Sequence, residues 1–149
     1  MIGSIIRSLA AVVAGLIVAF MLIIGVEGMS AVLHPFPPGV DSSDMEVCKA
    51  HVARFPQWIL ALAVVAWGFT VFAGSWVATR LGTGRHPAHG IVVGMLLLAA
   101  AVFNMSMLPY PAWFWVNVIV FPLAFLWGAK LAQGGRNKPL PVDNPSTLT

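Results

Sequence analysis

Long stretches without a charged residue constrain this chain more than any other feature. No Asp, Glu, Lys or Arg occurs between Arg7 and Glu27 or between Arg54 and Arg80, and none occurs in residues 86–129. A hydrocarbon core of about 30 Å needs roughly 20 apolar residues in a helix. Each of the first two stretches therefore predicts one membrane-spanning helix, and the third stretch is long enough for two.

Two prolines divide the third stretch. Pro109 and Pro111 each lack a backbone donor and bias the preceding residue away from the helix, so we expect a break there. Charged residues make up only 9% of the chain, whereas a soluble domain carries about 25%. We therefore predict an all-α integral membrane four-helix bundle over residues 1–133, followed by a disordered tail at 134–149. The expected spans are about residues 5–29, 57–79, 89–108 and 112–132.

The distribution of Lys and Arg predicts the orientation of the chain. Six of the eight basic residues lie near the start of the first span, between the second and third spans, or at and beyond the end of the fourth. Four crossings place all six on one side, and short cytoplasmic loops are enriched in Lys and Arg. We therefore expect both termini in the cytoplasm and the loop between the first two spans outside. The expected location is the cell membrane, and the size of the chain favours a bacterial inner membrane.

The outer loop is expected to contain a short surface helix, over residues 44–54. Ser43 and Glu46 have the spacing of a capping box at its start. Asp44, Cys48 and His51 would share one face of this helix, and all three are legitimate metal ligands. This is a candidate outward-facing metal site. Its spacing is not that of a structural zinc site, and a short amphipathic helix produces such faces by chance.

Two polar residues in the predicted spans are candidates for proton- or substrate-linked chemistry. Glu27 lies near the end of the first span, but the nearly apolar residues 28–33 could extend the helix past it. An ionisable group inside the hydrocarbon is costly and is a functional-site hypothesis by default. Asn104 lies at a similar depth in the third span and could hydrogen-bond to Glu27. The alternatives are an interfacial or structurally paired Glu27 and an Asn104 that only joins helices.

Small residues recur four positions apart in the last two spans. Such spacing lets helix backbones approach closely, which is how helices associate in lipid. The two interpretations are packing within the bundle, which we favour, and an interface between copies of the chain. The residues concerned are Gly90, Gly94, Ala124 and Gly128.

No motif in the sequence implies an enzyme or a cofactor. The chain has no Gly-rich phosphate loop and no helical His-Glu pair for zinc, and its scattered basic residues do not predict nucleic-acid binding. The favoured hypothesis is a non-enzymatic protein that acts through protein or lipid contacts, as an accessory subunit or a small bundle. The expected partners are the lipid bilayer and either further copies or a larger membrane complex. The alternative is a small proton-linked transporter in which Glu27 titrates.

The loop sequence carries one family resemblance. The stretch HPFPPGVD at residues 34–41, followed by Asp44-Met-Glu46 and by Phe55-Pro56, resembles a family of uncharacterised small bacterial membrane proteins. The likeness extends to the Trp67-Gly68 region and to residues 109–113. It implies a bacterial four-helix membrane protein and brings no activity with it.

Overall fold

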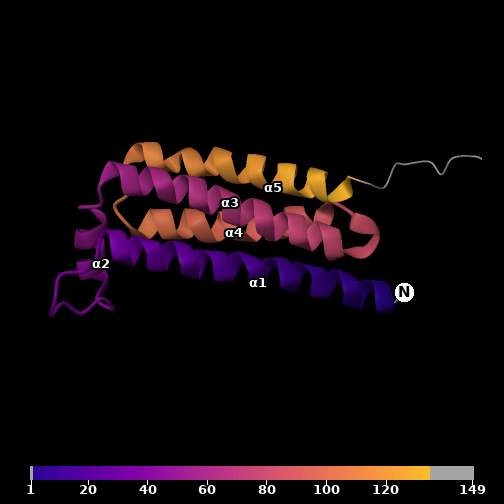
Figure 1. The fold of residues 1–149 in the computed structure, drawn as a ribbon, viewed down its shortest axis with the longest axis horizontal. Helices are drawn as coiled ribbons and strands as arrows, with labels where there is room; N and C mark the ends of the chain where they lie inside the picture. The colour runs from indigo at the N-terminus through magenta and orange to yellow at the C-terminus, as the bar shows by residue number, and fades with distance from the viewer. Residues whose placement is uncertain (1, 135–149) are drawn as a thin grey trace, which may run out of the picture.

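The computed structural model describes residues 2–134, and all the regular secondary structure in this part of the chain is helical (Figure 1). The described residues contain four helices that are long and apolar enough to cross a membrane, which confirms the predicted all-α class. Of the predicted tail at 134–149, all but Gly134 lies outside the described residues. The helices are α1 (Ile2–Leu33), α2 (Met45–Val52), α3 (Gln57–Leu81), α4 (Ala88–Met107) and α5 (Asn117–Gln133), with 3-10 turns η1 (Thr83–Arg85) and η2 (Ala112–Val116).

The four long helices run antiparallel to their chain neighbours (Figure 1). The start of α1 and the end of α5 lie at one end of the bundle, and α2 lies at the other. Helix α3 is the central element, because α1, α4 and α5 all pack against it. Helix α1 packs mainly on α3 and has few contacts with α4. The side of the bundle between α1 and α4 is therefore less tightly closed than the rest.

The first helix continues past the expected span of about residues 5–29, through the apolar residues that the sequence allowed to extend it. It reaches Leu33, and the amide of His34 still donates to the carbonyl of Ser30 at 2.8 Å. Residues 28–33 carry no proline or charge, and Pro35 is the first residue that disfavours helix for its predecessor. Glu27 consequently lies within the helix, not at its end.

The start of α2 differs from the predicted capping box. Asp44 is the N-cap, and its Oδ1 accepts a hydrogen bond from the amide of Glu46 at 2.9 Å. The amide and hydroxyl of Ser43 both donate to Oδ1 of Asp41, at 2.9 and 2.7 Å, so the Ser43 hydroxyl is committed to the preceding turn. The predicted Ser43 cap is therefore wrong, because a nearer carboxylate captures that side chain.

Close approaches between small residues hold the long helices together. A Cβ added at Gly15 of α1 would lie 2.6 Å from the carbonyl oxygen of Gly74 in α3. The same substitution at Gly128 of α5 would place a Cβ 2.5 Å from the carbonyl oxygen of Phe72. Small residues at these points let the backbones touch, as expected for helices in lipid.

The other predicted packing residues also face neighbouring helices within the chain. A Cβ added at Gly90 would lie 2.6 Å from the carbonyl oxygen of Ser75. Gly94 lies directly against the Phe125 side chain. Ala124 is partly buried against the main apolar core. These positions are used within the bundle described here.

Candidate functional site

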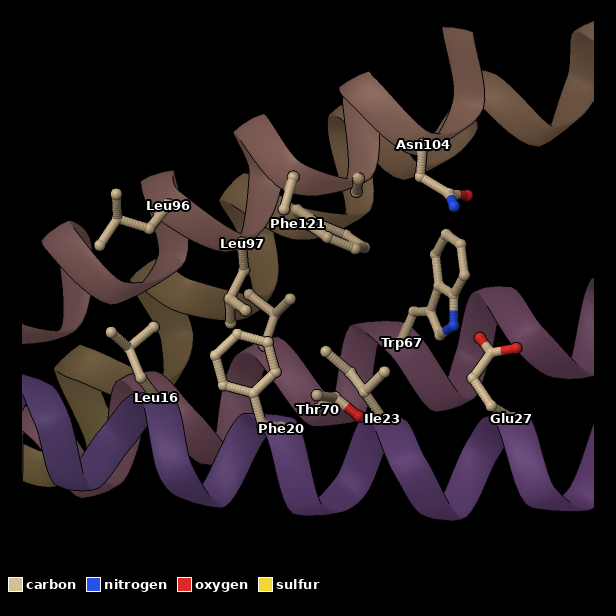
Figure 2. Close-up of a pocket in the computed structure, with 13 residues that line it drawn as sticks. Leu16, Phe20, Ile23, Glu27, Trp67, Thr70, Leu96, Leu97, Asn104 and Phe121 are labelled. Carbon is tan, nitrogen blue, oxygen red and sulfur yellow. The ribbon is translucent and has the colours of Figure 1, made fainter. Parts of the chain in front are cut away.

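An apolar groove of about 320 Å³ opens between α1 and α4, with side chains of α3 and α5 as its floor (Figure 2). Phe20 and Leu96 on its two rims are 56% and 51% exposed. The groove therefore opens sideways, on a face that a membrane would cover. Its lining residues are Leu16, Phe20, Ile23, Glu27, Trp67, Thr70, Val71, Leu96, Leu97, Ala100, Ala101, Asn104 and Phe121.

A second cavity of about 400 Å³ lies at the α2 end of the bundle and is more polar. The end of α1, the following loop and α2 form one wall, and α3, α4 and the Tyr110 turn form the other. Its polar lining residues are Glu27, Ser30, His34, Ser42, Cys48, His51, Asn104 and Tyr110. A molecule in this cavity would meet several hydrogen-bonding groups, which the groove largely lacks.

Three residues line both cavities. Glu27 of α1 and Asn104 of α4 point toward each other, and Trp67 of α3 lies between them (Figure 2). The structure thus brings together the two polar residues that the sequence singled out. Within the described part of the chain, no hydrogen bond joins Glu27 to Asn104. Both groups remain available to a molecule in either cavity.

Glu27 has no cationic partner among residues 2–134. The single ion pair in this part of the chain joins Lys49 Nζ to Glu46 Oε1 at 2.8 Å, on the surface of α2. Tyr110 is the titratable neighbour that senses Glu27. Burial, and secondly the Glu27 charge, raises the pKa of Tyr110 to about 12, so its phenol stays neutral. The carboxylate therefore faces aromatic and amide groups and no fixed positive charge.

Aromatic contacts hold Trp67 in place at the junction of the cavities. Its ring lies edge-on to Phe114 and Phe121, with centroids 5.5 and 6.4 Å apart. Phe114 is fully buried and stacks on Tyr110 at 4.4 Å. Such edge-to-face and stacked pairs stabilise one arrangement of the rings. The indole is thus a fixed wall of both cavities.

The candidate metal residues of α2 are each engaged with other groups. Asp44 caps the helix, and Cys48 Sγ donates to the carbonyl of Ser42 at 3.2 Å. The His51 ring is buried, with its centroid 3.8 Å from that of Phe36, and its Nε2 lies 3.1 Å from the carbonyl oxygen of His34. No group of three or more His, Cys, Asp or Glu side chains within residues 2–134 has the geometry to hold a metal ion.

Two parts of the site were not identified from the sequence. Trp67 was assigned no site role, although a tryptophan in the middle of an uncharged stretch is far from the boundary where its ring usually lies. Asn117, at the start of α5, is fully buried, and its Nδ2 donates to the Phe114 carbonyl at 2.9 Å. This bond fixes the turn that carries Phe114 against Trp67. An uncharged polar residue in a span was the available signal.

Comparison with protein-family profiles, with curated proteins and with solved structures finds no match to this chain. We therefore infer the function of this protein from the geometry of its two cavities.

Proposed function

We propose that this protein is a small multi-pass membrane protein that acts through lipid contacts. In this proposal, the groove between α1 and α4 binds the hydrocarbon chain of an amphipathic molecule that enters sideways from the bilayer. The observation that carries it is the continuity of an apolar groove with a polar cavity through Glu27, Trp67 and Asn104.

The chemistry of the two cavities supports an amphipathic occupant. Ligand sites are mostly apolar, with a few polar groups that fix the orientation of the ligand. Here the apolar and polar surfaces are separated along the bundle, so a molecule with an apolar tail and a polar head would match both. A hydrocarbon chain in the groove would keep contact with lipid-like surroundings along its whole length.

The charge distribution supports an orientation for this function. With the basic loops and both termini in the cytoplasm, the polar cavity and α2 would lie on the outer side. The head of the bound molecule would then reside in the outer half of the membrane. The location that we propose is a bacterial inner membrane.

Native mass spectrometry of protein extracted gently from its own membrane tests this proposal. We expect a lipid-like molecule to be retained at about one per chain, as a single groove predicts. Ala100 lines the groove, so Ala100→Trp should fill it and release the molecule. Ala99 is also exposed on α4 but lines neither cavity, so Ala99→Trp is the matched control.

Two outcomes would count against lipid binding. Equal retention by both tryptophan variants would mean that the molecule is bound elsewhere. A stable mixed complex with another protein, without a retained lipid, would favour the role of an accessory subunit.

One observation favours a second function, proton-linked transport. Glu27 lines both the sideways groove and the polar cavity, which is where a titrating group would alternate between a proton and a substrate. Proteoliposomes should then show substrate-dependent proton flux that Glu27→Gln abolishes. Flux unchanged by that substitution would exclude Glu27 as the titrating group.

A further inference from the structure

We propose that the occupant of the groove is a single-chain amphiphile with a cationic head, bound with its head against Glu27. This inference rests on the proposed function and adds the chemical class of the ligand. The head would lie at the junction of the two cavities, and the chain would extend along the groove toward Leu16.

The charge of the residues that line the two cavities favours a cationic head. Glu27 is the only acidic residue that lines either cavity, and no Lys or Arg lines them. Within the described residues it forms no ion pair. The Glu27 side chain is exposed within the described residues, so a membrane would surround it with hydrocarbon, where a carboxylate is unfavourable without a partner. A cation that arrives from the membrane would supply one. The other titratable side chains that line the polar cavity are His34, Cys48, His51 and Tyr110; none is a carboxylate, the Cys48 Sγ donates to the Ser42 carbonyl, and the pKa of Tyr110 is raised to about 12.

The groups around the junction of the two cavities also favour a cation. The face of an indole attracts a cation, and Trp67 stands between Glu27 and Asn104 (Figure 2). The amide oxygen of Asn104 adds an acceptor for any N–H of the head. An anionic head at this junction would meet the Glu27 carboxylate.

The polar groups along the groove limit where the head of the ligand can lie. The indole N–H of Trp67 lies at the Glu27 end of the groove as well, and beyond these groups and Asn104 the groove contains one further polar side chain, Thr70. Its hydroxyl donates to the Ala66 carbonyl at 2.9 Å and is buried, so it is already satisfied. A polar head therefore has one favourable position along the groove, at its Glu27 end.

The volume of the groove limits how many hydrocarbon chains it can hold. The groove of about 320 Å³ lies at the lower end of the roughly 300–1,000 Å³ typical of ligand sites. It suits one hydrocarbon chain better than two. This favours a single-chain cation over a two-chain lipid.

Two probes of equal chain length and opposite charge test the proposal. Radiolabelled dodecyltrimethylammonium and dodecanoate are titrated against protein in phosphatidylcholine nanodiscs at about pH 8, where both heads are charged. We expect saturable binding of the cation and binding of dodecanoate that is at least about tenfold weaker. Glu27→Gln should weaken binding of the cation by about tenfold or more and leave dodecanoate unchanged or slightly improved.

Each result supports or overturns the inference. If dodecanoate binds as tightly as the cation, or if folded Glu27→Gln binds the cation as tightly as the original chain, the cation assignment is wrong. The comparison of the two probes on the original chain decides the matter even if Glu27→Gln fails to fold. Absence of saturable cation binding also overturns it.

The groove variants separate this inference from the function on which it rests. Ala100→Trp should remove saturable binding of the cation, and Ala99→Trp should not. If both probes bind equally and Ala100→Trp removes both, the groove still binds hydrocarbon chains and only the preference for a cationic head fails. If Ala100→Trp changes neither probe, the groove is not the site and both proposals fail.

Discussion

Substitution of Gly15 by alanine tests the contact that places α1 against α3. The added Cβ would lie 2.6 Å from the Gly74 carbonyl oxygen and 2.8 Å from the Ala78 Cβ. Ordinary C···O contacts are not shorter than about 3.3 Å, so the two helices must separate by about 0.7 Å at this point. The obstructing atoms belong to the backbone and to a Cβ, so no flexible side chain can move aside.

The expected magnitude follows from two opposing effects. Overpacking of this kind costs about 1–3 kcal/mol. Alanine also favours helix over glycine by about 1 kcal/mol, which offsets part of that loss. We therefore expect Gly15→Ala to lower the free energy of unfolding by up to about 2 kcal/mol, and by about 1–3 kcal/mol more than a glycine-to-alanine change at an open helical position. The groove should also change shape, because α1 forms one of its walls.

Reversible unfolding in mixed micelles, followed by circular dichroism, measures this loss. Gly25→Ala is the matched control, because it lies in the same helix and an added Cβ there has no neighbour within 4 Å. The control should be neutral or slightly stabilised. If Gly15→Ala loses no more stability than Gly25→Ala, the close approach of α1 and α3 is not the contact that holds α1.

Three further predictions concern the α2 end of the bundle. Tyr110 is the only tyrosine, and its pKa of about 12 predicts that tyrosinate absorbance develops well above pH 10. Because the phenol of the unfolded chain ionises near pH 10, the free energy of unfolding should fall as the pH rises from about 10 to 12. Ionisation near pH 10 would show that the phenol is not buried. Burial, and secondly the His34 charge, lowers the pKa of His51. As the pH falls, His51 therefore takes up a proton at a higher pH in the unfolded chain than in the folded one. The packing of α2 should weaken as the pH falls below about 6.5. Amide exchange in α2, corrected for intrinsic rates, should then be faster at low pH; equal protection would contradict this. Asp44→Ala should lower the stability of α2 by about 1 kcal/mol in the same exchange experiment. A larger loss from Ser43→Ala than from Asp44→Ala would show that Ser43, not Asp44, caps the helix.

Much of the fold was predictable from the sequence because the hydrocarbon thickness sets the length of each apolar helix. The four spans, the break at Pro109 and Pro111 and the short α2 all follow from charge spacing and proline chemistry. The start of α2 was not predictable, because local competition decides it: Asp41 captures the hydroxyl of Ser43. The extension of α1 through residues 28–33 was one of the two arrangements that the sequence allowed, and the structure has it.

The candidate site was predictable only in part. Glu27 and Asn104 were identified because a polar residue in an apolar span is conspicuous. Both line the two cavities, but the hydrogen bond that the sequence allowed between them is not formed within the described residues. Trp67 was not identified as a third member, because an aromatic residue in a span has many ordinary packing roles. The candidate metal residues share α2, but each of them makes other contacts.

The sequence by itself determined that this chain is helical, that it has four candidate spans and where they break. Only the tertiary structure decided that α3 is central, that Gly15 meets Gly74, and that a groove remains open between α1 and α4. The reason is physical. Lipid tails are as apolar as the interior of the bundle, so an apolar residue carries no signal of whether it faces a helix or the membrane. The lateral arrangement comes from the fit of small and large side chains between helices, and that fit exists only after the helices have packed.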